Sequence, residues 1–145
     1  IFGYHHQEPF SKSSILNEKE ILSFSKKVME EYDVRPNSPN LITSNFSGGN
    51  QQKIILSREL NESPKVLLVG QPTRGVDIGA IEFIHQRLID MRDKGAAILL
   101  VSVELEEVLS LSDRIVVMFD GNIVGEKINK NVTDRELGLL MAGVA

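Results

Sequence analysis

The sequence predicts an α/β fold in which a mostly parallel sheet is flanked by helices. Residues 66–69 and 97–101 are two continuous apolar runs of strand length, and such runs are typical of buried parallel strands. The segments around them carry apolar residues at helical spacing and begin at recognisable capping residues. Strands that alternate with helices favour a parallel sheet covered by those helices.

Composition limits the kinds of protein that the chain can be. Its 145 residues, 41% of them hydrophobic, suit one packed domain or a piece of one. The net charge is only −4 and both signs are interspersed, so no nucleic-acid-binding surface is expected. There is no cysteine, which excludes disulfides and thiolate metal sites, and no apolar run approaches the ~20 residues of a membrane helix. The chain opens on Ile1 rather than Met, which indicates a piece of a longer protein.

The first half contains two expected helices. Residues 1–17 have no regular pattern and are expected to be loop-like. Asn17 and Glu20 have the spacing of a capping box before a helix that ends by Pro36. A turn-rich linker over 36–40 leads to a second helix, expected over about 49–60.

The second half alternates strands and helices. Asp77 caps a helix that Gly95 ends, and the expected inward face of this helix consists of Ile81, Ile84, Leu88 and Met91. A short helix follows the strand at 97–101. Asp120, Gly121 and Asn122 then indicate a hairpin turn. Thr133 and Glu136 form a capping box before the last helix.

Residues 46–53, Phe-Ser-Gly-Gly-Asn-Gln-Gln-Lys, are the most informative segment. Ser47, Gly48 and Gly49 stand at an expected helix start, where backbone N–H groups lack partners and the positive end of the helix dipole lies. Such a start suits a phosphate group. Taken alone, the segment is better explained as an ordinary helix cap with glycines for flexibility.

A second segment, residues 65–77, changes that balance because an apolar strand ends there in a Gln-Pro-Thr-Arg-Gly-Val-Asp turn. In order and spacing, the two segments resemble the signature motif and the Walker B/D-loop region of ATP-binding-cassette (ABC) ATPases. The resemblance implies a fragment of a P-loop NTPase-type ABC cassette with part of its helical subdomain. Residues 1–62 would end the helical subdomain and include the signature, and residues 63–145 would be the C-terminal half of the ATPase core.

The resemblance also implies roles for individual residues. In ABC ATPases two cassettes meet head to tail, and the signature of one closes on the γ-phosphate of the ATP held by the other. The signature residues that would bind ATP in this way are Ser47, Gly48, Gly49, Asn50 and Gln51. The D-loop residues expected at the cassette interface are Gly75, Val76 and Asp77, although Asp77 is also a plain helix cap.

Three positions depart from the pattern of an active cassette. The strand at 66–69 should lead to an Asp that helps to hold Mg²⁺ and a Glu that polarises the attacking water, but the chain has Gly70 and Gln71. Val103 stands where the family has a switch His. We therefore expect no intact catalytic residue and no metal ligand set in this chain. Neighbouring Glu104, Glu106 and Glu107 are interpreted as a solvated acidic face.

No Gly-x-x-x-x-Gly-Lys-Ser/Thr loop occurs in the chain, so a Walker A motif would precede Ile1. The isolated chain is therefore expected not to hydrolyse ATP. Two alternatives are weaker. One is a soluble ABC ATPase without a permease, and the other is a structural partner that never touches nucleotide.

The residues of these motifs resemble those of the second cassette of double-cassette bacterial importers for simple sugars (ribose/galactose type) or nucleosides. Residues 32–36 and 81–85 look closest to the nucleoside type, and the choice of solute stays open. The resemblance implies ATP, and Mg²⁺ in the full-length protein, as cofactors. The implied partners are a first cassette in the same chain, transmembrane permease subunits and, indirectly, a periplasmic or lipoprotein solute-binding protein. The implied location is the cytoplasmic face of the inner membrane.

Overall fold

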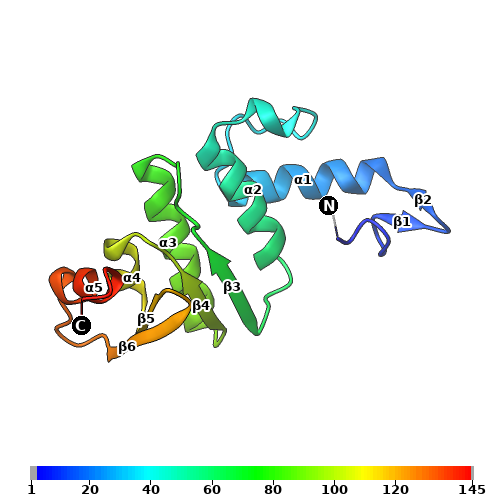
Figure 1. Cartoon of the computed structure of the whole chain (residues 1–145). Coiled ribbons are helices and arrows are strands. Elements are labelled where there is room, and N and C mark those ends of the chain that lie inside the picture. Colours follow the sequence, from blue (N-terminus) through cyan, green and yellow to red (C-terminus); the bar gives the residue numbers. More distant parts are fainter. Residues whose placement is uncertain (1–2, 145) are drawn as a thin grey trace. The chain divides into compact units, whose positions relative to one another are not determined.

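The computed structural model describes residues 3–144, which form two compact units (Figure 1). The first unit contains the chain up to residue 66 together with 73–97, and the second contains 67–72 and the chain from 98 onward. The elements follow in the order β1 Ser11–Lys12, β2 Ile15–Leu16, α1 Glu18–Glu31, a 3₁₀ turn Thr43–Asn45, α2 Gly48–Leu60, β3 Val66–Gly70, α3 Ile78–Asp93, β4 Ala97–Val101, α4 Leu105–Leu111, β5 Arg114–Phe119, β6 Asn122–Ile128 and α5 Asp134–Met141.

Three helices dominate the first unit. The expected start of α1 is confirmed, since the Asn17 side chain accepts the Glu20 N–H at 3.3 Å. Helices α2 and α3 pack against each other. The buried face of α3 contains Ala80, Ile84, Leu88 and Met91, so three of the four predicted inward positions are buried. The fourth, Ile81, is half-buried.

The segment before α1 is more ordered than the sequence predicts. Strands β1 and β2 form a short antiparallel ladder instead of a loop. Rings of Tyr4, Phe10 and Phe24 pack together, with 4.9 Å between the centroids of Phe10 and Phe24. The Tyr4 hydroxyl donates to the Arg58 carbonyl of α2 at 2.7 Å. Aromatic side chains therefore anchor this segment, although they follow no strand or helix period.

Strands β3 and β4 form a separate two-stranded parallel sheet. The Ala97 N–H donates to the Lys65 carbonyl at the start of both strands, and the Gln71 N–H donates to the Val101 carbonyl at their ends. The expectation that both strands are buried is wrong for this structure, because Val66, Leu68, Leu99 and Val101 are each more than half exposed. Exposed residues alternate with less exposed ones along both strands, so among the described residues one side of each strand has no covering layer.

The second unit is built around an antiparallel hairpin. Strands β5 and β6 are joined through Asp120 and Gly121, whose φ angles are +46° and +74°. Two successive positive φ angles are typical of a type I′ turn, which confirms the predicted hairpin. Buried Ile115 and Val117 of β5 pack with Leu137 of α5. The predicted capping box of Thr133 and Glu136 is present at the start of α5.

Compactness defines these two units. The division at residue 62 into a helical subdomain and an ATPase core is a functional one, and it stays a prediction. None of the helices within residues 3–144 combines the length and apolarity needed to cross a membrane.

Candidate functional site: the start of α2

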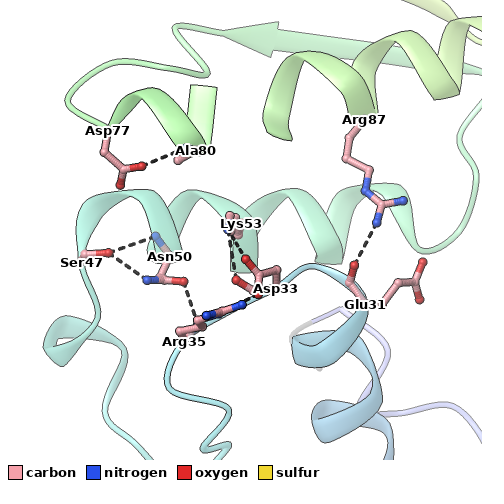
Figure 2. Close-up of polar contacts among 9 residues, drawn as sticks. All are labelled: Glu31, Asp33, Arg35, Ser47, Asn50, Lys53, Asp77, Ala80 and Arg87. Atoms are coloured by element: carbon pink, nitrogen blue, oxygen red, sulfur yellow. Dashed lines mark hydrogen bonds and ion pairs between the residues drawn. The ribbon is translucent and has the colours of Figure 1, made fainter. Parts of the chain in front are cut away.

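The first turn of α2 presents polar groups to solvent. Ser47 is the N-cap residue, with extended backbone angles, and its hydroxyl oxygen accepts the Asn50 N–H at 3.4 Å (Figure 2). Ser47 and Gly48 are both exposed. The first N–H groups of a helix have no acceptor within the helix, so this exposed turn offers donors and a positive dipole end to an anion.

The two glycines of this turn lie against the segment before α3. A Cβ on Gly48 would lie 3.1 Å from the Gly75 carbonyl oxygen. A Cβ on buried Gly49 would lie 2.9 Å from both the Ala80 Cβ and the Asp77 Oδ2. Gly49 therefore lets the backbone of α2 approach α3 closely. A simple need for flexibility does not account for it.

The expected D-loop residues lie beside this turn. The Asp77 carboxylate accepts the Ala80 N–H at 2.9 Å, so its role as the N-cap of α3 is confirmed. Gly75 has a φ of +73°, a conformation that side chains disfavour. Val76 is half-buried. Within the first unit the structure thus brings residues 75–77 of the second segment beside the start of α2. An interface role for Gly75, Val76 and Asp77 stays a prediction.

The amide side chains after the glycines turn toward their own chain. Gln51 Nε2 donates to the Phe46 carbonyl at 2.8 Å. Asn50 Nδ2 donates to the Ser47 hydroxyl oxygen at 2.9 Å, and Asn50 Oδ1 accepts the Arg35 N–H at 2.8 Å (Figure 2). Of the five predicted signature residues, Ser47 and Gly48 are the two that are exposed.

The turn after α1 contacts α2 and stabilises its position. The sequence did not indicate this contact. Lys53 Nζ donates to the Asp33 carbonyl oxygen at 3.0 Å and approaches its carboxylate at 3.4 Å. The Arg35 guanidinium donates to the same carboxylate at 2.7 Å. These bonds, that from Arg35 first, hold the pKa of the Asp33 carboxyl below its usual value. No local pattern connects residues 33–35 with residues 50–53.

Helix α3 holds the same turn through Arg87. Its guanidinium donates to the Glu31 carbonyl at 2.9 Å (Figure 2). The guanidinium lies 4.8 Å from the Tyr32 ring centroid. It also lies 5.1 Å from the Phe83 ring, and Lys53 lies 4.8 Å from that ring. Cation–π contacts of this kind contribute about 0.5–1 kcal/mol at exposed sites. The turn is therefore fixed by both α2 and α3.

The three departures from the catalytic pattern lie at one sheet edge in the second unit. Gly70 ends β3 and Gln71 follows it with a φ of +50°, while Val103 follows β4 and is 60% exposed. The bond from Gln71 to Val101 shows that the two strands end side by side. A Cβ on Gly70 would meet no atom within 4 Å, so the missing carboxylate reflects the residue type and not a lack of space.

The interpretation of the neighbouring glutamates as a solvated acidic face is wrong for Glu107. Glu104 and Glu106 are exposed, as expected of a solvated face, but Glu107 is only 2% exposed. Glu107 lies on the inner side of α4, a helix of only about two turns, which is too short for its sequence to define a buried face. Within residues 3–144 no group of three or more His, Asp and Glu side chains is arranged to hold a metal ion.

Known proteins resemble the chain both in sequence and in fold. It is 48% identical over 139 residues to the nucleoside import ATP-binding protein NupA of Lactococcus lactis, covering 96% of this chain and 28% of that protein. It is 46% identical to the guanosine import ATP-binding protein NupO of Bacillus subtilis, of which it covers 27%. Identity to the ribose import ATP-binding protein RbsA of Streptococcus agalactiae is 39%, again over 27% of that protein. No family model matches the chain.

Solved structures of ABC cassettes share the fold of the chain. The ATP-binding cassette MJ1267 of an ABC transporter superposes with a TM-score of 0.68 at 26% identity, over 89% of this chain and 53% of that one. A dimeric cassette, MJ0796, bound to ADP and Pi superposes with a TM-score of 0.67 at 21% identity, over 85% and 53% of the two chains. The chain thus spans about a quarter of its curated relatives and about half of a solved cassette. By sequence and fold, it belongs to the ABC ATP-binding proteins, with homologues among those of nucleoside and ribose import.

Proposed function

We propose that the chain is part of the ATP-binding subunit of an ABC importer, in which it supplies the signature motif to an ATP site built on another cassette. The observation that carries this proposal is the start of α2. An exposed hydroxyl and an exposed glycine stand there on a helix N-terminus that α3 and the turn after α1 hold in place.

The chemistry of this turn fits the terminal phosphate of ATP. A hydroxyl donor, bare backbone N–H groups and the helix dipole each favour a negative group, and hydrogen bonds to charged groups are the stronger kind. Gly48 has no side chain to keep a phosphate away.

We propose that the chain's own nucleotide site is catalytically degenerate. Gly70, Gln71 and Val103 offer no carboxylate and no imidazole at the ends of β3 and β4. These residues do not fit Mg²⁺, which prefers carboxylate oxygens, so no step is assigned to a metal ion there. One competent site would then survive, formed by the signature of this chain and the phosphate-binding loop of the first cassette.

The transported solute is proposed to be a nucleoside. The relatives with 48% and 46% identity are named for nucleoside and guanosine import, and the ribose relative has 39%. The proposed partners are a first cassette in the same full-length chain, permease subunits in the membrane and a solute-binding protein outside it. The subunit would be peripheral to the cytoplasmic side of the membrane.

A γ-phosphate probe tests the signature role. The full-length protein is irradiated with an ATP analogue that carries an aryl azide on its γ-phosphate, and labelled peptides are identified by mass spectrometry. Label is expected in the peptide that ends at Lys53, and excess ATP should suppress it. The peptide containing Ser23, on the exposed side of α1, is the internal control. If the probe labels the protein but none of the label lies in residues 36–53, the proposal is contradicted.

A further inference from the structure

Asn50 has both ends of its amide engaged inside the chain. Its Oδ1 accepts the Arg35 N–H at 2.8 Å, and its Nδ2 donates to the Ser47 hydroxyl oxygen at 2.9 Å (Figure 2). The orientation of the amide is determined, because the Arg35 N–H can only donate and must therefore face the oxygen. The NH₂ group is left to face Ser47.

This arrangement fixes the direction of the Ser47 proton. A hydroxyl oxygen has two acceptor positions and one proton. Both acceptor positions of Ser47 are used by Asn50, one by its side-chain NH₂ at 2.9 Å and one by its backbone N–H at 3.4 Å. The Ser47 O–H therefore points away from Asn50, and Ser47 is an exposed residue.

We propose that Asn50 is a positioning residue that keeps the Ser47 hydroxyl oriented as a hydrogen-bond donor to the phosphate, and that it does not itself contact the nucleotide. This inference rests on the proposed signature role of Ser47. It differs from the sequence-based expectation that Asn50 is one of the ATP ligands.

The support behind Asn50 is rigid. The Arg35 N–H belongs to the turn that Lys53 holds through the Asp33 carbonyl at 3.0 Å and that Arg87 holds through the Glu31 carbonyl at 2.9 Å. Lys53 lies one helical turn beyond Asn50, so α2 carries both anchor points. A side chain that is anchored in this way keeps one rotamer, and the hydroxyl it contacts keeps one orientation.

A double-mutant cycle in the full-length protein tests the inference, with steady-state ATP hydrolysis as the readout. Ser47→Ala and Asn50→Ala should each lower the turnover roughly ten- to a hundredfold, the value of one hydrogen bond to a charged group. In the Ser47→Ala background, Asn50→Ala should cause no further loss. Additive losses would overturn the inference, because Asn50 would then act on the nucleotide or on the fold and not through Ser47.

Asn50→Asp separates orientation from folding. It is isosteric and keeps the acceptor for the Arg35 N–H, but its carboxylate draws the Ser47 proton inward. Its turnover relative to the unsubstituted protein should rise as the pH falls toward the pKa of the new carboxyl, because a protonated carboxyl restores the donor. A ratio independent of pH would overturn the inference. If Ser47→Ala alone left hydrolysis unchanged, the proposed signature role itself would fail, which is a distinguishable result.

Discussion

The start of α2 and the end of β3 are two turns that the ABC pattern assigns to ATP, and they differ in how they are supported. At the start of α2, Gly49 packs on Asp77 and Ala80, and Asn50 connects Ser47 to the backbone of Arg35. At the end of β3, Gly70 has open space at its Cβ position, and Gln71 offers an amide where a carboxylate would be needed.

The difference separates two tasks of a nucleotide site. Contact with a phosphate needs directed donors, and the α2 turn has them together with the packing that fixes their direction. Hydrolysis needs a proton acceptor and a metal ligand, and the β3 turn has neither. A chain built in this way can complete a partner's site while its own site stays inactive.

The largest loss of activity is expected from a substitution in the α2 turn. Ser47→Arg in the full-length protein should lower ATP hydrolysis about a hundred- to a thousandfold, since removal of one transition-state charge contact has that cost and the bulk of Arg adds to it. Steady-state phosphate release measures the loss. Ser23→Arg, which adds the same charge to an exposed position of α1, should keep the activity. Equal activity of the two variants would mean that the α2 turn is outside the working site.

A second experiment restores the missing catalytic side chains at the ends of β3 and β4. Gly70→Asp, Gln71→Glu and Val103→His are combined in a full-length protein whose first cassette lacks its own catalytic Glu. Measurable hydrolysis is expected from the triple variant and not from Gln71→Glu alone, because residues that act as one catalytic unit are strongly non-additive. Space is available, since Gly70 has no close neighbour and Val103 is 60% exposed. Hydrolysis by the single variant would show that the site is not degenerate.

A matched pair of glycine substitutions probes the packing behind the α2 turn. Gly49→Ala places a Cβ 2.9 Å from both the Ala80 Cβ and the Asp77 Oδ2, so unfolding free energy should fall by about 1–3 kcal/mol. Gly79→Ala, in the first turn of α3, meets only an ordinary 3.5 Å contact and should be neutral or stabilising by about 0.5–1 kcal/mol. Denaturant unfolding of both variants checks the difference. A neutral Gly49→Ala would contradict the close approach of α2 to α3.

The smallest effect concerns pH. The pKa of Asp33 is lowered in the folded protein, so its bonds to Arg35 and Lys53 contribute stability above the usual aspartate value of about 4. That contribution is lost as the pH falls through the lowered folded pKa. Asp33→Asn should therefore lower the unfolding free energy near neutral pH. It should also make the unfolding free energy less dependent on pH in the acid range. An unchanged pH dependence below about pH 4 would show that the contact between this turn and α2 does not depend on this charge.

Much of the fold could be predicted from the sequence because the signals were local. Caps at Asn17, Asp77 and Thr133 and the Asp120–Gly121 turn each depend on residues a few positions apart. The burial of β3 and β4 could not be predicted, because it depends on covering layers that a strand pattern does not specify. Glu107 was misassigned for a similar reason, since α4 is too short for its sequence to define a buried face.

The sequence proposes residues for the candidate site but does not give their geometry. The motifs predict ATP contacts at Ser47, Gly48 and Gly49 and missing catalytic carboxylates at Gly70 and Gln71, and these roles stay predictions. The motifs did not indicate that Asn50 reaches back to Arg35, because that contact joins residues 15 positions apart across a turn without a periodic pattern. Positional motifs name the residues near a ligand, and only the structure separates those that face it from those that hold the others.

This chain is proposed to supply a signature to a partner's site and to perform no hydrolysis at its own. The ATPase rate of full-length Gln71→Gly tests whether its own site is inactive. Glycine suits the φ of +50° at this position, so the side chain is removed without backbone strain. We expect a rate within about twofold of the unsubstituted protein, because an amide without a metal ligand beside it is not a working base. A loss of about a hundredfold or more, the usual contribution of a general base, would instead place Gln71 in the catalytic machinery and show that the site at the end of β3 is active.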